Sequence, residues 1–492
     1  MTQVIERPSR VKAVHGWLRT IRLAYVPGPT TPMVDTVAEE LLDRFRERGH
    51  SVQAEPDSST DVILTTAGFG VPMPWRQALL FSARRRFGID HSPTVVTLVH
   101  ATPQDVQAML DRLEAALARE PLDPADFEFP GLAPTAHRVL VEQGRRGGPM
   151  LSLLRVLQSQ VKCLRIVLVV GRDRPEQAYH FDLVGAHPRS EADDPSAFYD
   201  DIVLRIVTAA STREVTDHEV RPDVVPRATW ASLQTPEAMR HAGQQLGERN
   251  FFTEMVRIAD LVHVPAVGAA VAAQYSEGCF ATWEPRLPAL IATITGSARP
   301  VDKGNITDDD LAVVVGVRPG ASGAIVRHVE GKRNDSPSSE AVELMEMDSA
   351  LPRTTLGEGF DFQDSVPVLR SKLHGHRAIA AYDARLVEYV PLDLPYYYYP
   401  VSCATGAQAQ GIKQAFARAE SVRLPDDPRQ VVFTVLPGHG VVIGEKWVAG
   451  KAPFQVMWEC MDAGALEVAN RIPQGLMEFA PGPDGRMHLR EP

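Results

Sequence analysis

The sequence predicts an α/β protein with two Rossmann-like α/β domains followed by a β-rich C-terminal domain. Apolar strand-like runs alternate with amphipathic runs in the first part, and a second such set follows a Pro-rich stretch. From about residue 311 the pattern becomes strand-like, divided by Gly and Pro. A chain of 492 residues is too long to fold around a single hydrophobic core. We therefore expect three domains, at 1–160, 161–345 and 346–492.

The first domain is expected to contain an open parallel sheet, since each apolar run is followed by a run with helical spacing. Thr102 stands where it would cap the third helix. The expected strands are 20–27, 61–70 and 94–101, and the expected helices are 31–49, 75–88 and 102–120.

The middle domain is expected to begin with the strand 164–171 and to include the amphipathic run that starts at Pro236. Residues 285–295, "PRLPALIATIT", have the length of one helix. Pro285 and Pro288 would fit its first turn, where a missing N–H costs little, and Gly296 would end it.

The last third contains five strand-like runs and one expected helix, "GAQAQGIKQAFARAE". The pattern favours antiparallel pairing. The strand-like runs are "LAVVVGVR", "GAIVRHVEG", "VPVLRSKLHGHRAIAAYD", "QVVFTVLPGHGVVIGEKWV" and "PFQVMWE".

Composition excludes some classes of partner. The net charge of −11 argues against nucleic acid as a main partner. No apolar run reaches the length of a membrane span, and no apolar segment follows the basic N-terminal residues. Four cysteines without a CxxC motif suggest a reducing compartment. We therefore expect a soluble cytoplasmic protein whose main partner is neither nucleic acid nor a membrane.

The common nucleotide and hydrolase motifs are missing from the sequence. There is no complete GxGxxG, Walker lysine, HExxH or GxSxG pattern. Cys279 could be a nucleophile with His439, but its apolar surroundings favour a buried thiol.

Two carboxylates and one histidine stand out as candidate metal ligands. Glu277 lies in an apolar context, where an unpaired carboxylate is costly, and Asp302 follows a Thr-Gly turn. His439 lies between two glycines that separate two strand-like runs. Each could also be an ordinary surface or hairpin residue. Together, two oxygen donors and one imidazole would suit Mn²⁺ or Mg²⁺ better than tetrahedral zinc.

The stretch "SEGCFATWEPRLPALIATITGSARPVD" resembles the core motif of the L-fucose isomerase and L-arabinose isomerase superfamily. Glu277, Thr295-Gly296 and Asp302 match its motif positions, and His439 in "LPGHGVVI" resembles its late histidine ligand. The order of these motifs is similar. The chain departs from the pattern at Cys279, where the family often has an acid.

The resemblance implies a metal-dependent aldose–ketose isomerase that works through an enediol. By that resemblance, Glu277 and Asp302 are ligands and also the proton-transfer pair, and His439 is the third ligand. It further implies a homo-oligomer, a trimer or hexamer. A hydrolase or lyase of a carbohydrate or sugar acid on the same scaffold, and a non-enzymatic sugar-binding protein, remain alternatives.

A wider set of residues could bind the substrate. The two histidines of "LHGHR" would share one face of a strand, two tryptophans could stack on a sugar, and polar blocks could bind hydroxyl or acidic groups. Ordinary packing or solvation is the alternative for each. These residues are His374, His376, Trp283, Arg327, His328, Lys332, Glu445 and Trp447.

Overall fold

The computed structural model forms two compact units, unit 1 with the described residues up to 212 and unit 2 with those from 218 onward. The described residues are 19–68, 93–105, 108, 164–172, 175, 177–182, 185–190, 195–212, 218–249, 251, 278–294, 304–360, 365–375, 377–393, 404–424, 427–436, 440–469 and 478–490.

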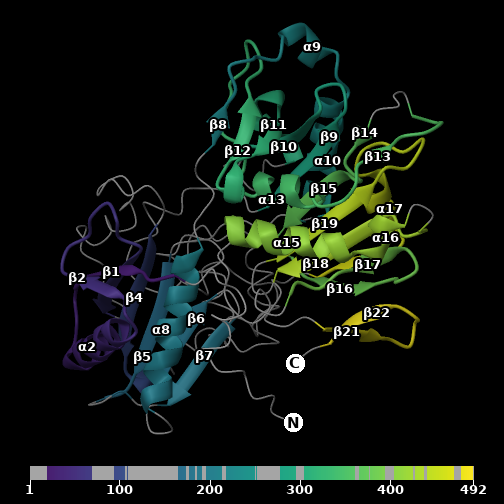
Figure 1. Ribbon diagram of the computed structural model, residues 1–492. Coiled ribbons are helices and arrows are strands. Elements are labelled where there is room, and N and C mark those ends of the chain that lie inside the picture. The colour runs from purple at the N-terminus through teal and green to yellow at the C-terminus, as the bar shows by residue number, and fades with distance from the viewer. Residues whose placement is uncertain are drawn as a thin grey trace. The chain divides into compact units, whose positions relative to one another are not determined.

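Unit 1 is built on a seven-stranded sheet in the order β2-β1-β3-β4-β5-β6-β7 (Figure 1). The strands from β2 to β5 pair in parallel, and β6 and β7 add antiparallel pairs at one side. The strands are β1 (Arg22–Val26), β2 (Ser51–Gln53), β3 (Val62–Gly68), β4 (Thr94–Ala101), β5 (Leu164–Val170), β6 (Gln177–Asp182) and β7 (Gly185–Ser190).

Helices α2 (Pro32–Glu47) and α8 (Pro195–Ser211) pack against this sheet and against each other. Thr31 caps α2, because its hydroxyl accepts a hydrogen bond from Val34 N at 3.4 Å. Apolar residues at helical spacing bury one face of α2. The strands expected at 20–27, 61–70 and 94–101 and the helix expected at 31–49 are confirmed within a few residues.

The beginning of the expected helix 102–120 is also confirmed where it is described. Asp105 N donates to Thr102 Oγ1 at 3.1 Å, and Thr102 N donates to Asp105 Oδ2 at 2.9 Å. These two bonds form a capping box. Most of that helix, and all of the helix expected at 75–88, lie outside the described residues.

The expected division at residue 160 differs from the two units of the structure. β4 and β5 lie on opposite sides of residue 160 and pair in parallel along their whole length, from Val95–Leu164 to Ala101–Val170. The strand at 164 therefore continues the first sheet instead of opening a second one. Residues on both sides of 345 likewise share one sheet in unit 2.

Unit 2 is built on a nine-stranded sheet in the order β17-β18-β19-β15-β9-β10-β11-β12-β8. All of its pairs are antiparallel except β17 with β18 and β12 with β8. The strands are β8 (Glu219–Val220), β9 (Cys279–Glu284), β10 (Ala289–Thr293), β11 (Leu311–Val317), β12 (Ala324–Arg327), β15 (Leu369–Gly375), β17 (Val387–Tyr389), β18 (Val431–Leu436) and β19 (Gly440–Lys446).

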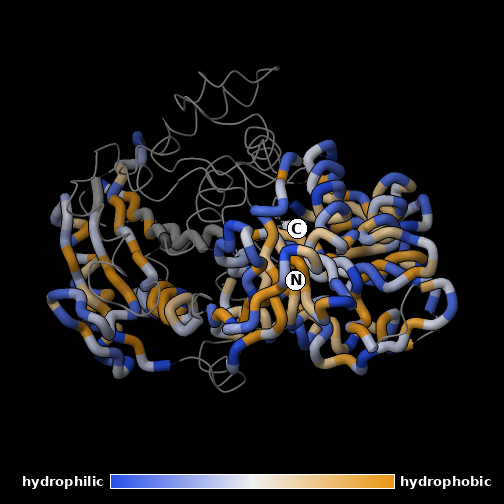
Figure 2. The backbone as a smooth tube through the Cα atoms, turned by 90° about the horizontal axis from the view of Figure 1, so that it is seen from above, coloured by the Kyte–Doolittle hydropathy of each residue, from blue (hydrophilic) through white to orange (hydrophobic). Residues whose placement is uncertain are grey.

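Helices cover both faces of this sheet. One face packs on α9 (Arg227–Ala231), α10 (Thr235–Glu248) and α17 (Gln455–Asp462), and the other packs on α13 (Ala341–Glu346) and α15 (Gly406–Arg418), with α16 (Glu420–Arg423) following α15. We call these the α17 face and the α13 face. In Figure 2 the apolar colour follows the strands and the polar colour gathers in the turns.

Smaller elements complete unit 2. A four-stranded sheet has the order β20-β16-β22-β21, and β13 pairs with β14. Their bounds are β13 (Thr354–Thr355), β14 (Ser365–Val366), β16 (Ile379–Tyr382), β20 (Leu466–Val468), β21 (Glu478–Pro481) and β22 (Met487–Arg490), and the 3-10 helices are η4 (Asp308–Asp310) and η5 (Pro319–Ala321). Among the described residues, no helix is both long and apolar enough to cross a bilayer.

The helix expected at 285–295 is wrong. Residues 285–288 form a turn, and β9 and β10 on either side of it pair as a hairpin, with Ala289 opposite Glu284. Every residue of both strands is buried, because the sheet carries helices on both faces. A continuous apolar run is typical of such a strand, and its length alone could not distinguish it from a helix.

The strand-like interpretation of "PFQVMWE" is also wrong, because this run forms most of α17. Its first turn is held by the buried Glu445 carboxylate, which accepts hydrogen bonds from Phe454 N and Met457 N, both at 2.8 Å. The β18–β19 hairpin and the helix α15 are confirmed. The last third is thus β-rich, as expected.

Candidate functional site

One end of the nine-stranded sheet gathers the segments that carry the candidate ligands. Cys279 at the start of β9 pairs with His374 near the end of β15. On the other side of β15, His374 pairs with Val442 and Gly375 with Val441, close to the start of β19. We call this end of the sheet the Cys279 end.

Two further strands reach the Cys279 end. β10 runs antiparallel to β9, with Ala292 opposite Ala281, so β10 ends where β9 begins. β18 ends at Leu436, which pairs with Gly440 at the start of β19. Five neighbouring strands of this sheet therefore begin or end here.

Four candidate residues lie outside the described residues, and three of them directly adjoin these strand ends in sequence. Glu277 precedes Gly278, His376 follows Gly375, and His439 precedes Gly440; Asp302 belongs to the segment between Ile294 and Gly304. Within the described parts of the chain, no group of three or more His, Cys, Asp or Glu side chains could hold a metal ion. The expected metal site stays a prediction.

A buried acid and histidine face each other at the Cys279 end. His374 on β15 is fully buried, and its Nε2 lies 3.5 Å from Oε1 of Glu340, which is 5% exposed. His374 Nδ1 lies 3.1 Å from Val441 O. A carbonyl oxygen only accepts, so Nδ1 must carry a proton and donate. Nε2 can then contact the carboxyl group favourably only if one proton lies between them.

The end of β10 places Glu340. Ser338 N donates to Thr293 O at 2.9 Å, and Ile294 forms an isolated bridge with Pro337. Glu340 is the residue just before α13, so α13 starts at the Cys279 end on the α13 face. The strand end thus fixes where the acid stands relative to His374.

The α17 face of the same end is closed by an aromatic ring. A Cβ added at Gly375 would overlap the ring of Phe251, which follows α10 and is 1% exposed. Only glycine at position 375 allows this packing. Phe251 therefore shields the end of β15 from solvent on that side.

The polar residues Arg327, His328 and Lys332, which were expected to bind substrate, lie several strands away from the Cys279 end. β12 is three strands from β9, about 14 Å at a strand spacing of ~4.8 Å. Arg327 Nε lies 2.8 Å from Asp223 Oδ2. Lys332 Nζ donates to the carbonyl oxygens of Leu311 and Arg333, and burial lowers the pKa of Lys332. His328 is partly buried beside them. Arg327 thus joins β12 to the segment after β8, and Lys332 joins its loop to the start of β11.

The remaining candidates lie toward the opposite end of the strands. Glu445 follows Gly440 by five residues on β19, or ~17 Å at about 3.4 Å per residue. Trp447 lies beyond it, and Trp283 lies on β9 four residues from Cys279. Trp283 packs under the guanidinium of Arg353, 5.2 Å from its ring centre. The structure therefore does not bring these residues to the Cys279 end.

The Glu445 carboxylate is buried and accepts hydrogen bonds that hold the fold together. Burial raises the pKa of Glu445 to about 7, against hydrogen bonds from Met457 N, Ser371 Oγ and Phe454 N that lower it. By accepting from Phe454 N and Met457 N, the Glu445 carboxylate caps the first turn of α17. This role was missed from sequence, because Glu445 stands in a strand and the helix it caps begins ten residues later.

Glu340 was also missed from sequence. Its position before an apolar run is ordinary for a helix start, and its partner His374 lies 34 residues further along the chain. Only the pairing of β15 beside the start of α13 could reveal it.

The sequence matches no model of a known protein family and no curated protein.

Proposed function

We propose that the chain is a metal-dependent aldose–ketose isomerase with its active site at the Cys279 end. Glu277 and Asp302 would transfer the proton between the two sugar carbons, and His439 would complete a donor set for Mn²⁺ or Mg²⁺. The motif order in the sequence supports this proposal, and so does the register of the nine-stranded sheet.

The pairing of Cys279 with His374, and of His374 with Val442, is the observation that carries the proposal. It puts the starts of β9 and β19 two strands apart, about 10 Å at a spacing of ~4.8 Å. Residues just before these strands, Glu277 and His439, can therefore approach one ion from two sides. The helix once expected between Glu277 and Asp302 would have separated them, whereas the hairpin returns the chain to the same end.

The donor set fits the cation. Carboxylate oxygens with one imidazole nitrogen suit Mn²⁺ or Mg²⁺. When bound, such an ion would stabilise the negative charge that develops on the sugar oxygens. One carboxylate would take the proton from the carbon beside the carbonyl, and the other carboxyl group would exchange protons with the sugar oxygens. The proton then returns to the neighbouring carbon, so the reaction needs no oxidant or reductant.

The Glu340–His374 pair would serve as a positioning pair. The bond from His374 Nδ1 to Val441 O and the 3.5 Å approach of Glu340 would fix the end of β15. Burial of the pair keeps water away from these contacts.

Finer parts of the proposal depend on the resemblance. Five neighbouring parallel strands support a Rossmann-like arrangement in unit 1, whereas a second Rossmann-like domain has only the resemblance behind it. A sugar substrate, a cytoplasmic location and a trimer or hexamer remain proposals. The segment 396–399, "YYYY", which would suit a subunit interface, lies outside the described residues.

The decisive test combines metal analysis with a panel of aldoses. The purified protein should contain Mn²⁺ or bind it stoichiometrically, and it should form a ketose from at least one aldose. Glu277→Gln and Asp302→Asn should each lower kcat at least ~1,000-fold while the circular dichroism spectrum stays unchanged. Glu358→Gln, an exposed acid far from the Cys279 end, is the matched control and should keep full activity.

Three outcomes would reject the isomerase. Wild-type rates in both Glu277→Gln and Asp302→Asn would show that these residues do not transfer the proton. Cleavage or elimination products in place of a ketose would favour the hydrolase or lyase. Sugar binding without metal and without conversion would favour a binding protein.

A further inference from the structure

A cleft of about 680 Å³ opens in unit 2 beyond the end of β19, on the side away from the Cys279 end. Residues 350–357, residues 421–424 and the end of β19 form its walls. We propose that this cleft is a second binding site, which takes an organic phosphate bearing a flat ring, such as a nucleotide. The inference stands apart from the proposed isomerase activity.

The charge of the cleft points to an anion. Arg353, Arg423 and Lys446 line it, and none of its lining residues is acidic. The chain as a whole carries a net charge of −11. A local concentration of positive charge in an acidic protein attracts anions selectively. Among the described residues, none of the three cations forms an ion pair with a carboxylate.

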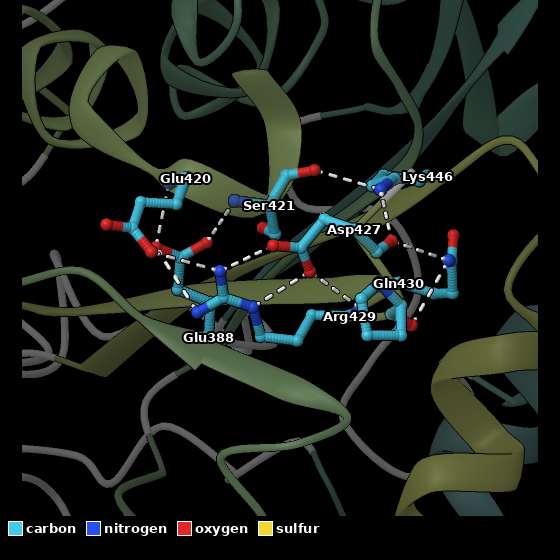
Figure 3. A network of polar contacts seen from close by, with 8 residues as sticks. Glu388, Glu420, Ser421, Asp427, Arg429, Gln430 and Lys446 are labelled. Atoms are coloured by element: carbon cyan, nitrogen blue, oxygen red, sulfur yellow. Dashed lines mark hydrogen bonds and ion pairs between the residues drawn. The ribbon is translucent and has the colours of Figure 1, made fainter. Parts of the chain in front are cut away.

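A polar network fixes Lys446 in the wall of the cleft (Figure 3). Lys446 Nζ donates to Ser421 O at 2.8 Å and to Asp427 O at 3.2 Å. The carboxylate of Asp427 is turned to Arg429 instead, with 2.6 Å between Arg429 Nη2 and Asp427 Oδ2. The hydrogen bonds from Arg429 lower the pKa of Asp427 to about 2. Lys446 is thus held by two neutral oxygens.

This arrangement leaves Lys446 suited to a ligand. Burial lowers the pKa of Lys446, more than the Asp427 charge raises it. A bound phosphate would offset the cost of burying the ammonium group. Ser421 also lines the cleft, and its hydroxyl, 1% exposed, has no hydrogen-bond partner within the described part of the chain. It can donate to a ligand oxygen.

Two aromatic side chains also line the cleft. Trp447 and Phe360 meet edge to face with 6.1 Å between their ring centres. Trp447 Nε1 donates to Pro367 O at 2.8 Å, and the guanidinium of Arg370 lies 4.9 Å from its ring centre. These contacts fix the indole in advance, which lowers the entropy cost of packing a ring against it.

Size and chemistry together select the ligand class. Pockets for small molecules occupy roughly 300–1,000 Å³, and they combine apolar walls with a few convergent polar groups. Arginine and lysine side chains suit the several oxygens of a phosphate better than a single carboxylate. A flat ring would pack on the aromatic wall while the phosphates meet the cations.

Calorimetric titration of the full chain tests the proposal, with ADP and UDP as probes. Adenosine carries the ring alone, and pyrophosphate carries the charge alone. We expect at least one nucleotide to bind at least tenfold more tightly than both partial probes, with affinity falling as salt is added. Arg423→Gln and Arg353→Gln should each weaken nucleotide binding at least fivefold.

Arg418→Gln is the matched control, because Arg418 ends the neighbouring helix α15 but does not line the cleft. It should leave the affinity unchanged. The proposal is overturned if neither nucleotide binds below 1 mM (about −4 kcal/mol). It is equally overturned if pyrophosphate binds as tightly as the nucleotides, or if all three arginine variants behave alike.

Discussion

Asp348, in the turn after α13, and Glu445, on β19, are both buried against the nine-stranded sheet, on its opposite faces, yet their partners differ. On the α13 face, Asp348 Oδ1 lies 2.6 Å from Nζ of Lys372, and both side chains are at most 2% exposed. On the α17 face, Glu445 has Ser371 Oγ and two backbone N–H groups as donors. One carboxylate has a buried cation, and the other has neutral donors.

The difference shows two ways to compensate the burial of a carboxylate. A cation at contact distance balances the charge itself, but it requires that Lys372 also leave water. Neutral donors only stabilise the ionised form in part, so burial still raises the pKa of Glu445 to about 7. The α13 face therefore depends on an ion pair, and the α17 face depends on the protonation of one group.

Removal of one partner of the ion pair should give the largest effect. Lys372→Met leaves Asp348 buried without a cation, and we expect the free energy of unfolding to fall by about 3–5 kcal/mol. Urea denaturation measures this loss. The effect would be large because Asp348 Oδ2 also accepts from Leu369 N at 2.9 Å, so the carboxylate cannot turn to water.

The double variant Lys372→Met with Asp348→Asn is the control. Asn keeps an acceptor for Leu369 N but carries no charge, so at least half of the lost stability should return. If the double variant is no more stable than the single one, the uncompensated charge is not the cause.

Protonation of Glu445 should give the next effect. Its folded pKa of about 7 lies above the ordinary 4.5, so the folded protein binds the proton more tightly than the unfolded chain. The resulting stabilisation is complete below pH 4.5 and is lost as the pH rises through 7. It amounts to roughly 3 kcal/mol, at 1.36 kcal/mol per unit.

Glu445→Gln should flatten that part of the stability profile. The free energy of unfolding of both proteins is measured in urea at several values between pH 4.5 and 7.5. We expect the wild type to lose stability relative to the variant over this interval. Parallel profiles would mean that Glu445 does not take up a proton on folding.

Sequence patterns predicted the elements whose signals are local. The apolar spacing of residues 31–49 marked α2, and the glycines around His439 marked the β18–β19 hairpin. The run 289–293 was mistaken for a helix because burial on both faces removes the alternation that identifies a strand. "PFQVMWE" was mistaken for a strand because its N-terminal cap is Glu445, on another element.

Long-range partners account for what could not be predicted about the site. Glu277, Asp302 and His439 rest on residue type, sequence context and the motif resemblance; they lie outside the described residues, so their convergence on one ion stays a proposal. Nothing near Glu340 in sequence indicates His374, since that contact requires both the β9–β15 pairing and the bridge from β10 to Pro337. Sequence spacing can suggest candidate metal ligands, whereas only the strand pairing shows which strand ends lie side by side.

The smallest loss of stability should come from breaking a surface ion pair whose contact distance equals that of Lys372 and Asp348. Arg385 Nη2 lies 2.6 Å from Asp383 Oδ2, as close as Lys372 to Asp348, but Arg385 is 85% exposed. Water already solvates that guanidinium, so Arg385→Gln should destabilise the protein far less than Lys372→Met does. Salt at 0.5 M should remove most of this small loss, since exposed charges are screened, and should leave the loss in Lys372→Met nearly unchanged. Equal losses in the two variants would show that contact distance, and not burial, decides what an ion pair contributes in this protein.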